Sequence, residues 1–170
     1  MSCVQRIGGD SKREWFDTQL ATSRYLGAGR SVGDYLRQII NARDQVAALL
    51  VKGPACDAVK DQDRWIGCSA NQRVERLKPV VQNRRSPVFG EKARTPNLAS
   101  QALGAALRAL PAPWRENFGY RPLLAEGFTD PEAHAGTCYK ASNWEPMDFS
   151  AGYAWHRADF YMPNERPKRL

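Results

Sequence analysis

Residues 95–110 predict the best-defined helix of this chain, and the segments on both sides of it predict strands. Thr95 can cap the helix and Pro96 suits its first position. Its apolar stripe is formed by Leu103, Leu107 and Leu110. An apolar strand is expected near residues 84–90 and another at 123–129, the run LLAEGFT. This strand–helix–strand order predicts an α/β fold in which helices flank a mixed central sheet.

The remaining pattern completes that architecture. Residues 11–25 predict a polar helix, and residues 31–40 and 45–51 a strand pair, although the spacing of their apolar residues also permits helix. A further helix is expected from Ser69, since Ser69 and Gln72 have capping-box spacing and apolar residues follow on one face (Val74, Leu77, Val81). Pro79 should kink or end it, and Pro87 should restrict the following strand to an edge or a bulge. Asp130 and Pro131 should open a last helix that ends near Asn143.

Cysteine and histidine spacing gives no metal site. The four cysteines (Cys3, Cys56, Cys68, Cys138) contain no closely spaced pair, and the histidines are His134 and His156. His134 and Cys138 lie one helical turn apart, but two ligands do not close a zinc site. A nucleophilic Cys138 would also need a base, and spacing implies no third group to orient His134. We therefore expect reduced, structural thiols, no metal and no cofactor.

Charge is distributed unevenly along the chain, whose formal net charge is +7. Residues 71–95 carry seven cations against two carboxylates, whereas residues 126–148 carry one cation against five. Such a basic band can neutralise phosphates, so nucleic acid, and DNA in particular, is the expected partner. The alternative is a solvated surface helix. The candidate contacts are Arg73, Arg76, Lys78, Arg84, Arg85 and Arg94.

Four residues are candidates for catalysis. Glu126 lies inside an apolar strand, where a lone carboxylate must meet a cation such as Arg94 or face a cleft, and there it could serve as a general base. Asp130 follows four residues later. Tyr139 and Lys140 could donate hydrogen bonds to a phosphate or acyl oxygen. The alternatives are a structural ion pair for Glu126, a core position for Tyr139 and solvation for Lys140.

Asn97 and Ser100, near the start of the helix at 95–110, could hold an anion or could cap that helix.

Several segments, read in order, resemble the Druantia protein A family. They are RYLGAGRSVGDYLR, DRWIG, RVERLKPVVQNRR, RTPNLASQALGAALRALP, GYRPLLAEGFTDPEAHAGTCYKASNW and PKRL. The resemblance implies a part in anti-phage defence or in mobile-element biology, with other defence-system or transposase proteins as partners. Residues 139–144 also look distantly like an ending found in GNAT-type acetyltransferases, which implies a GNAT-like fold in the C-terminal half. RTPNLAS lacks the glycines of that fold's phosphate loop, so coenzyme A is not expected.

These observations divide the chain into a partial N-terminal helical segment at 1–23 and a Druantia A-like domain at 24–170, which the resemblance leads us to expect is truncated at its C-terminus. No apolar run is long enough to cross a bilayer and no signal peptide is evident, so a cytoplasmic protein without a membrane partner is expected. The function we predict is nucleic-acid association in defence or in a mobile element. An acyl- or nucleobase-modifying transferase, and an inactive truncated family member, stay as alternatives.

Overall fold

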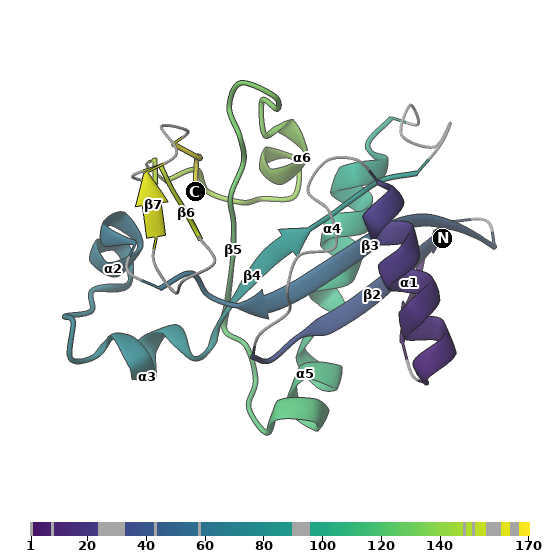
Figure 1. Ribbon diagram of the computed structural model, residues 1–170, viewed down its shortest axis with the longest axis horizontal. Coiled ribbons are helices and arrows are strands. Elements are labelled where there is room, and N and C mark those ends of the chain that lie inside the picture. The colour runs from purple at the N-terminus through teal and green to yellow at the C-terminus, as the bar shows by residue number, and fades with distance from the viewer. Residues whose placement is uncertain are drawn as a thin grey trace.

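A five-stranded mixed sheet forms the centre of the molecule (Figure 1). The computed structural model describes residues 2–7, 9–23, 33–42, 44–57, 59–89, 96–147, 149–150, 152–155, 161–163 and 167–170. Strands lie in the order β1 (Ser2–Arg6), β2 (Leu36–Ala42), β3 (Gln45–Pro54), β4 (Val80–Arg85) and β5 (Leu124–Gly127). Neighbouring strands are antiparallel except β4 and β5, which are parallel. A separate antiparallel hairpin pairs β6 (Tyr153–Trp155) with β7 (Tyr161–Pro163).

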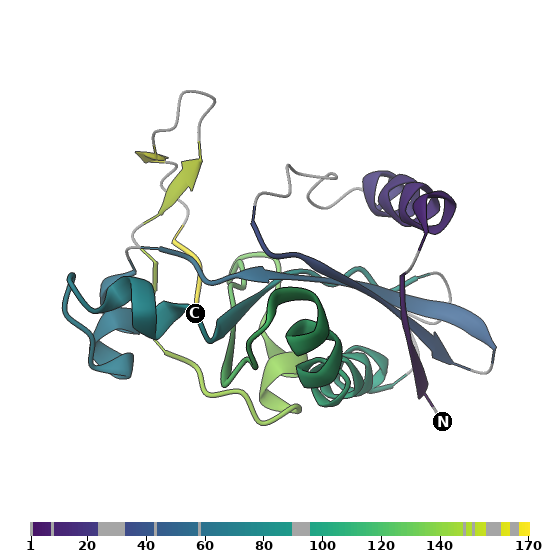
Figure 2. The same ribbon diagram turned by 90° about the horizontal axis from the view of Figure 1, so that it is seen from below.

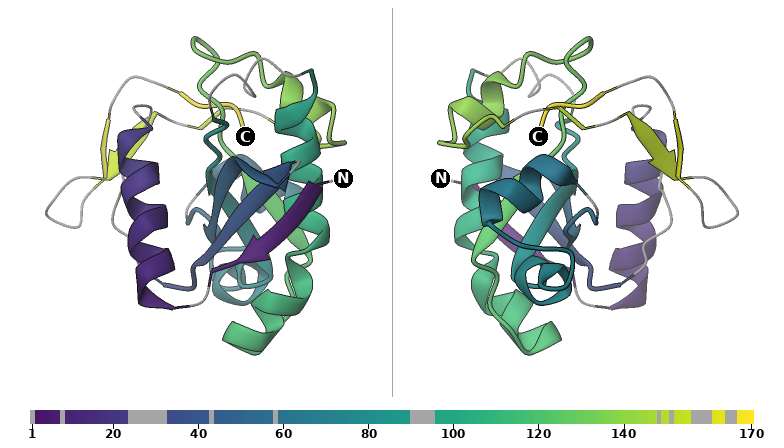
Figure 3. Two further views of the ribbon diagram at one scale, coloured as in Figure 1. Left: turned by 90° about the vertical axis from the view of Figure 1, so that its right-hand side faces the viewer. Right: turned by 90° about the vertical axis from the view of Figure 1, so that its left-hand side faces the viewer.

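Helices cover both faces of this sheet (Figures 2 and 3). One face carries α1 (Asp10–Thr22), and the other carries α4 (Leu98–Arg108), α5 (Pro111–Phe118) and the short α6 (Thr137–Lys140). Two more short helices, α2 (Lys60–Ile66) and α3 (Arg73–Leu77), connect β3 to β4 at one end of the sheet. The predicted α/β class with a mixed, helix-flanked sheet is therefore confirmed. Among the helices that the structure describes, none combines the length and apolar character needed to traverse a bilayer.

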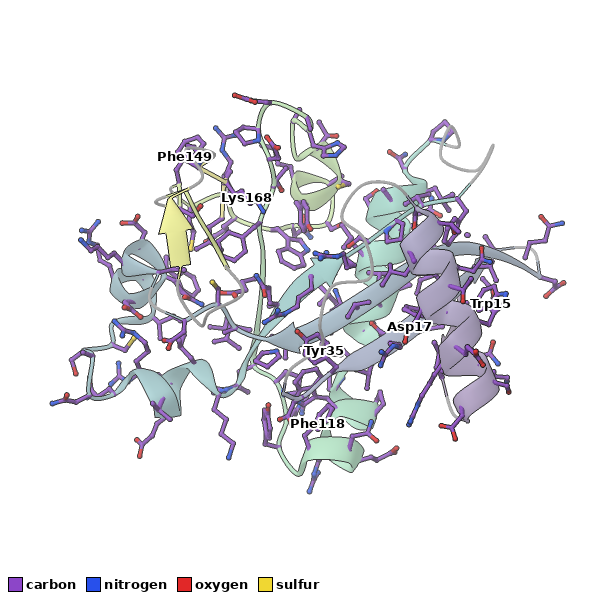
Figure 4. The ribbon with its side chains drawn as sticks, in the orientation of Figure 1. Trp15, Asp17, Tyr35, Phe118, Phe149 and Lys168 are labelled. Carbon is purple, nitrogen blue, oxygen red and sulfur yellow. The ribbon has the colours of Figure 1, made fainter. Side chains whose placement is uncertain are left out.

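Alternation of side chains along β3 explains why both of its faces are apolar. Leu49 and Val51 join α1 in one core cluster, whose other buried members are Ile7, Phe16, Leu20 and Ile39. Ala48 and Leu50 point the opposite way and join α4 in a second cluster, with Ile40, Ala102, Leu103 and Ala106. Arg37 of β2 also binds the Asp17 carboxylate of α1 through two hydrogen bonds, of 2.9 and 3.0 Å (Figure 4). Residues of α5 close the end of the sheet in a third cluster, in which Trp114 is fully buried.

The end of the β4–β5 ladder is the feature that shapes the candidate site. The two strands pair from Val80 and Leu124 as far as Asn83 and Gly127, and β4 then continues beside β3 for two more residues. The β3–β4 register shifts at this point, because Lys52 pairs with Asn83 and Val51 with Arg85. Beyond it, Leu49 N–H donates to the Pro87 carbonyl at 3.1 Å. The irregularity that Pro87 predicted is present, although β4 lies inside the sheet.

Several predicted element boundaries need correction. The helix expected from Ser69 is only five residues long, and Val81 belongs to β4, which starts earlier than residue 84. The helix expected at 95–110 begins at Leu98, after Asn97 in a left-handed conformation, and Thr95 lies outside the described residues. The last helix, expected to open at Asp130 and end near Asn143, spans only Thr137–Lys140, and residues 141–147 are turn and loop. β1, α2 and α5 were not predicted, and β1 pairs with β2 in the same sheet as the rest of the domain.

Candidate functional site

A chain of buried polar side chains crosses from β3 to α6 where the β4–β5 ladder ends. Lys52 of β3 is fully buried, and its Nζ donates to Asn83 Oδ1 at 2.8 Å. The amide Nδ2 of Asn83 donates to the Tyr139 hydroxyl at 2.8 Å and to Ser86 Oγ at 2.5 Å. The Tyr139 ring lies over Gly127, where an added Cβ would come within 2.9 Å of a ring carbon. Gly127 thus leaves room for the phenol at the point where β5 ends.

Burial shifts the pKa of the two groups at the ends of this row of polar side chains, Lys52 and Tyr139. Removal from water lowers the pKa of Lys52 from 10.5 to about 7, because the interior disfavours the ammonium form. Burial likewise raises the pKa of the Tyr139 phenol, and hydrogen bonds from Asn83 and Ser86 partly offset that effect. Perturbed groups of this kind gather at functional sites, although structural networks also contain them.

Glu126 lies on the opposite face of the sheet from Tyr139. It pairs with Gln82, one position before the Asn83–Gly127 pair, so its side chain points away from α4 and α6. Its carboxylate accepts hydrogen bonds from the Cys56 backbone N–H at 2.6 Å and from the Gln62 side-chain amide. Burial raises the pKa of Glu126 to about 7, against the opposing effects of these hydrogen bonds and of Arg84. The structure therefore does not bring Glu126 and Tyr139 into one cleft, and Arg94, the cation expected to pair with Glu126, lies outside the described residues.

Lys140 is exposed beside a pocket of about 360 Å³ next to α6. Tyr139 and Gly127 form part of its wall, and Trp144 packs edge-to-face on the Tyr139 ring at a centroid distance of 4.9 Å. The C-terminal residues also line it. In that segment Lys168 N–H donates to Ser150 Oγ at 2.9 Å, close to Phe149 (Figure 4). Of the predicted catalytic residues, Tyr139 and Lys140 share this pocket and Glu126 and Asp130 do not line it.

Three other candidates make local contacts. The Asp130 carboxylate accepts the Glu132 backbone N–H at 3.0 Å and so holds a turn rather than a helix. Asn97 and Ser100 flank the start of α4, where the Ser100 hydroxyl donates to the Asn97 carbonyl at 2.9 Å.

The basic residues are divided between α3 and β4. Arg73 is bound to Asp63 at 2.6 Å and joins α3 to α2, while Arg76 donates to the carbonyl of Gly67 at the end of α2. Lys78 is exposed and lies 5.2 Å from the centroid of the Tyr120 ring. Arg84 and Arg85 are half-buried on β4, where Arg84 stacks on Tyr35 (Figure 4). Arg76 and Lys78 are thus the exposed members of the predicted band that the structure describes.

Lys52, Asn83 and Gln62 were missed by sequence reasoning. Lys52 directly follows the apolar run AALLV, and a cation at the end of a buried strand was an available signal. Asn83 and Gln62 carry no local signal for their contacts with Lys52, Tyr139 and Glu126, because these partners lie 31 to 64 residues away along the chain. In the described ranges, no three His, Cys, Asp or Glu side chains gather as metal ligands.

Comparison with known proteins gives a family and a fold. The sequence model of the family described as Druantia protein DruA matches residues 2–160. No curated protein matches the chain. Among solved structures, AAC(6′)-Iy in complex with a bisubstrate analogue, CoA-S-monomethyl-acetylneamine, is similar over 95% of this chain and 97% of that chain, with 17% identity and a TM-score of 0.52. That protein is a GNAT-type acetyltransferase, so the expected GNAT-like fold is confirmed.

Proposed function

Because the chain belongs to the family of the Druantia protein DruA, we propose that it takes part in anti-phage defence and that it does so by binding DNA. The observation that carries the DNA-binding part is the exposed surface of α2, α3 and the turn before β5. Its exposed cations are Lys60, Arg64, Arg76, Lys78 and Arg121, of which Arg64 is bound to Asp61 at 3.0 Å. The formal net charge of +7 favours association with a polyanion in general.

Large apolar side chains accompany these cations. Trp65 is 55% exposed on α2, and Val74 is 82% exposed on α3, one helical turn before Lys78. Leu123, also exposed, donates its backbone N–H to the Pro79 carbonyl at 2.8 Å and therefore lies at the end of α3. Trp65 is the aromatic member of this set and offers a ring for stacking on a base, and the adjoining cations suit a nucleic-acid backbone.

Replacement of two of these cations tests the proposal. Labelled single-stranded and duplex DNA would be titrated at 50 mM salt with the wild type and with Arg76→Ala/Lys78→Ala. The double variant should bind at least about tenfold more weakly, since each lost phosphate contact removes a counterion-release contribution. Thermal denaturation would confirm that the loss of the Arg76 hydrogen bond to α2 leaves the variant folded.

A matched control removes the same charge from another surface. Lys12 and Arg13 are exposed on α1, and Lys12→Ala/Arg13→Ala should leave DNA affinity nearly unchanged. Equal losses in both double variants would indicate only a general charge effect. No binding of the wild type at 50 mM salt would reject the DNA-binding proposal.

Acyl transfer is a second candidate, favoured by the Lys52–Asn83–Tyr139 chain beside the α6 pocket. The pocket's volume of about 360 Å³ falls in the range of small-molecule sites. AAC(6′)-Iy, which shares the fold, is bound to an analogue that contains CoA. In such a reaction the thioester C–S bond breaks, the acyl carbon bonds to an acceptor nitrogen or oxygen, and the proton lost by the acceptor is balanced by one gained by the thiolate.

Release of free thiol from acetyl-CoA, measured with and without small amines or DNA, tests this second candidate. Tyr139→Phe should abolish any such release, whereas Tyr35→Phe, at a residue that does not line the α6 pocket, should not. An unchanged rate in Tyr139→Phe would exclude the phenol from the reaction.

A further inference from the structure

Lys52 is an unfavourable residue to place inside a sheet. It is fully buried on β3, and its Nζ donates to the Asn83 oxygen at 2.8 Å. Isolated buried cations are costly unless they are paired, and no carboxylate bonds to Lys52 within the described residues. Its neighbours on the same strand face, Ala48 and Leu50, are ordinary apolar core residues.

Lys52 fixes the orientation of the Asn83 side-chain amide. In its ammonium form Lys52 has three donors and no acceptor, so below its pKa of about 7 the amide atom that faces it is the oxygen. In that form the usual ambiguity between the amide oxygen and nitrogen is removed at Asn83. With Oδ1 turned to Lys52, the Nδ2 group must face Tyr139 and Ser86, as the distances of 2.8 and 2.5 Å show.

Asn83 in turn fixes which partner donates in its hydrogen bond with Tyr139. The amide donates to the phenol oxygen, so this hydrogen bond uses a lone pair of Tyr139 and leaves the phenol proton available. Ser86, whose Oγ accepts from Asn83, also hydrogen-bonds the phenol and lowers its pKa, as a donor to the phenol oxygen does. Tyr139 and Gly127 both line the α6 pocket, so the phenol stands in the wall of a cavity that a small molecule can enter.

We infer that Lys52 and Asn83 are positioning residues that hold Tyr139 as a hydrogen-bond donor, and that the α6 pocket takes a ligand whose carbonyl oxygen accepts this bond. An acyl thioester is the ligand class, and this part rests on the second candidate function, acyl transfer. This role accounts for a lysine at a core position, because Lys52 fixes the direction of two successive hydrogen bonds.

The hydrogen-bond direction can be tested without any ligand. Asn83→Asp has the same shape but replaces the amide donor by an acceptor, so the phenol must donate to it. The pKa of Tyr139 should then rise, as followed by NMR of protein labelled at the tyrosine ζ-carbon and assigned with Tyr139→Phe. Lys52→Met, which frees the Asn83 amide to turn, should move the pKa of Tyr139 in the same direction. Asn117→Asp on α5 is the control for added charge and should leave it unchanged.

The ligand class is tested with acetyl-CoA and CoA, which differ in the acetyl group alone. The wild type should bind acetyl-CoA roughly 3- to 10-fold more tightly than CoA, the worth of one hydrogen bond. Asn83→Asp and Tyr139→Phe should reduce this ratio to about one, and Asn117→Asp should preserve it. If neither compound binds the wild type, acyl transfer is rejected, while the positioning role is still decided by the pKa of Tyr139. An unchanged pKa in Asn83→Asp would overturn the positioning role itself.

Discussion

At the scale of single residues, Lys52 makes two opposing contributions to the free energy of unfolding. A pKa near 7 in place of 10.5 means that burial of the ammonium form costs on the order of 5 kcal/mol below pH 7. Removal of the amine would leave Asn83 Oδ1 unsatisfied, at a cost of about 1–3 kcal/mol. The first effect is larger, so the wild-type lysine lowers the stability of the fold at neutral and acidic pH. Such losses are characteristic of residues retained for function.

Lys52→Met should therefore stabilise the protein, and most strongly at acidic pH. Because the folded-state pKa lies below the unfolded one, the penalty is complete below pH 7 and is lost as the pH rises from 7 to 10.5. The stabilisation should fall by about 1.4 kcal/mol per pH unit in that window. Urea denaturation at pH 6 and pH 9 measures it, with Lys12→Met on the exposed face of α1 as the control. A stability difference that is the same at both pH values would contradict the argument.

At the scale of elements, the sequence pattern predicted the helices and strands whose formation depends mainly on residues close together in the chain. The apolar runs at β2, β3 and β5, the polar segment at α1 and the apolar stripe of α4 each predicted the element that the structure contains. α3 was extended too far, because Val74, Leu77 and Val81 share a helical spacing. Pro79 ends α3, and Val81 pairs with Pro54 and Ala125 in the sheet, while Val74 stays exposed. Strand pairing across long separations outweighed local periodicity there.

The candidate site was only partly predictable for the same reason. Tyr139 and Lys140 were identified from one stretch rich in polar residues, and in the structure both line the α6 pocket. The partners of Glu126 were not identified, since Cys56 and Gln62 precede it by 70 and 64 residues. Which face of β5 carries Glu126 also depends on the register with β4, and a single-residue slip would have reversed it.

Glu126 connects α2 and the segment before it to β5, which makes a second pH-dependent prediction. Its folded-state pKa of about 7 exceeds the ordinary 4.5, so its contribution to stability is complete below pH 4.5 and is lost as the pH rises through 7. The loss should be on the order of 3 kcal/mol. Glu126→Gln should remove this pH dependence, because an amide does not ionise. The fold should be kept, since the new amide still accepts one hydrogen bond and can donate to the unpartnered, buried Gln62 Oε1.

Urea denaturation at pH 5 and pH 8, together with amide exchange of residues 56 and 60–66, measures the effect of Glu126→Gln. Relative to the wild type, the variant should gain stability at pH 8 and keep the slow exchange of α2. Glu14→Gln on the exposed side of α1 should reproduce the wild-type pH dependence. Faster exchange confined to α2 at pH 8 but not at pH 5 would show that the ionised carboxylate, rather than its shape, holds the helix.

At the scale of the whole molecule, folding reduces the number of cations available to a polyanion. Arg73 binds Asp63, and Arg84 and Arg85 are half-buried on β4. The exposed set around α2, α3 and the following turn contains five residues (Lys60, Arg64, Arg76, Lys78 and Arg121), and Arg64 among them is bound to Asp61. A surface of this size can neutralise about two to four phosphates, fewer than the full basic band of the sequence suggests.

The salt dependence of DNA binding measures that number directly. The logarithm of the binding constant falls by about 0.9 per tenfold rise in salt for each phosphate contacted. Two to four contacts therefore predict that affinity falls roughly 10- to 150-fold between 50 and 200 mM salt. Arg76→Ala/Lys78→Ala should lower the slope by about 1.8, whereas Lys12→Ala/Arg13→Ala should leave it unchanged. A loss near a thousandfold would require about six contacts, and would mean that Arg73, Arg84 or Arg85 leave their protein partners when DNA binds. A flat salt response would instead show that the exposed cations do not meet phosphates, because counterion release accompanies every such contact.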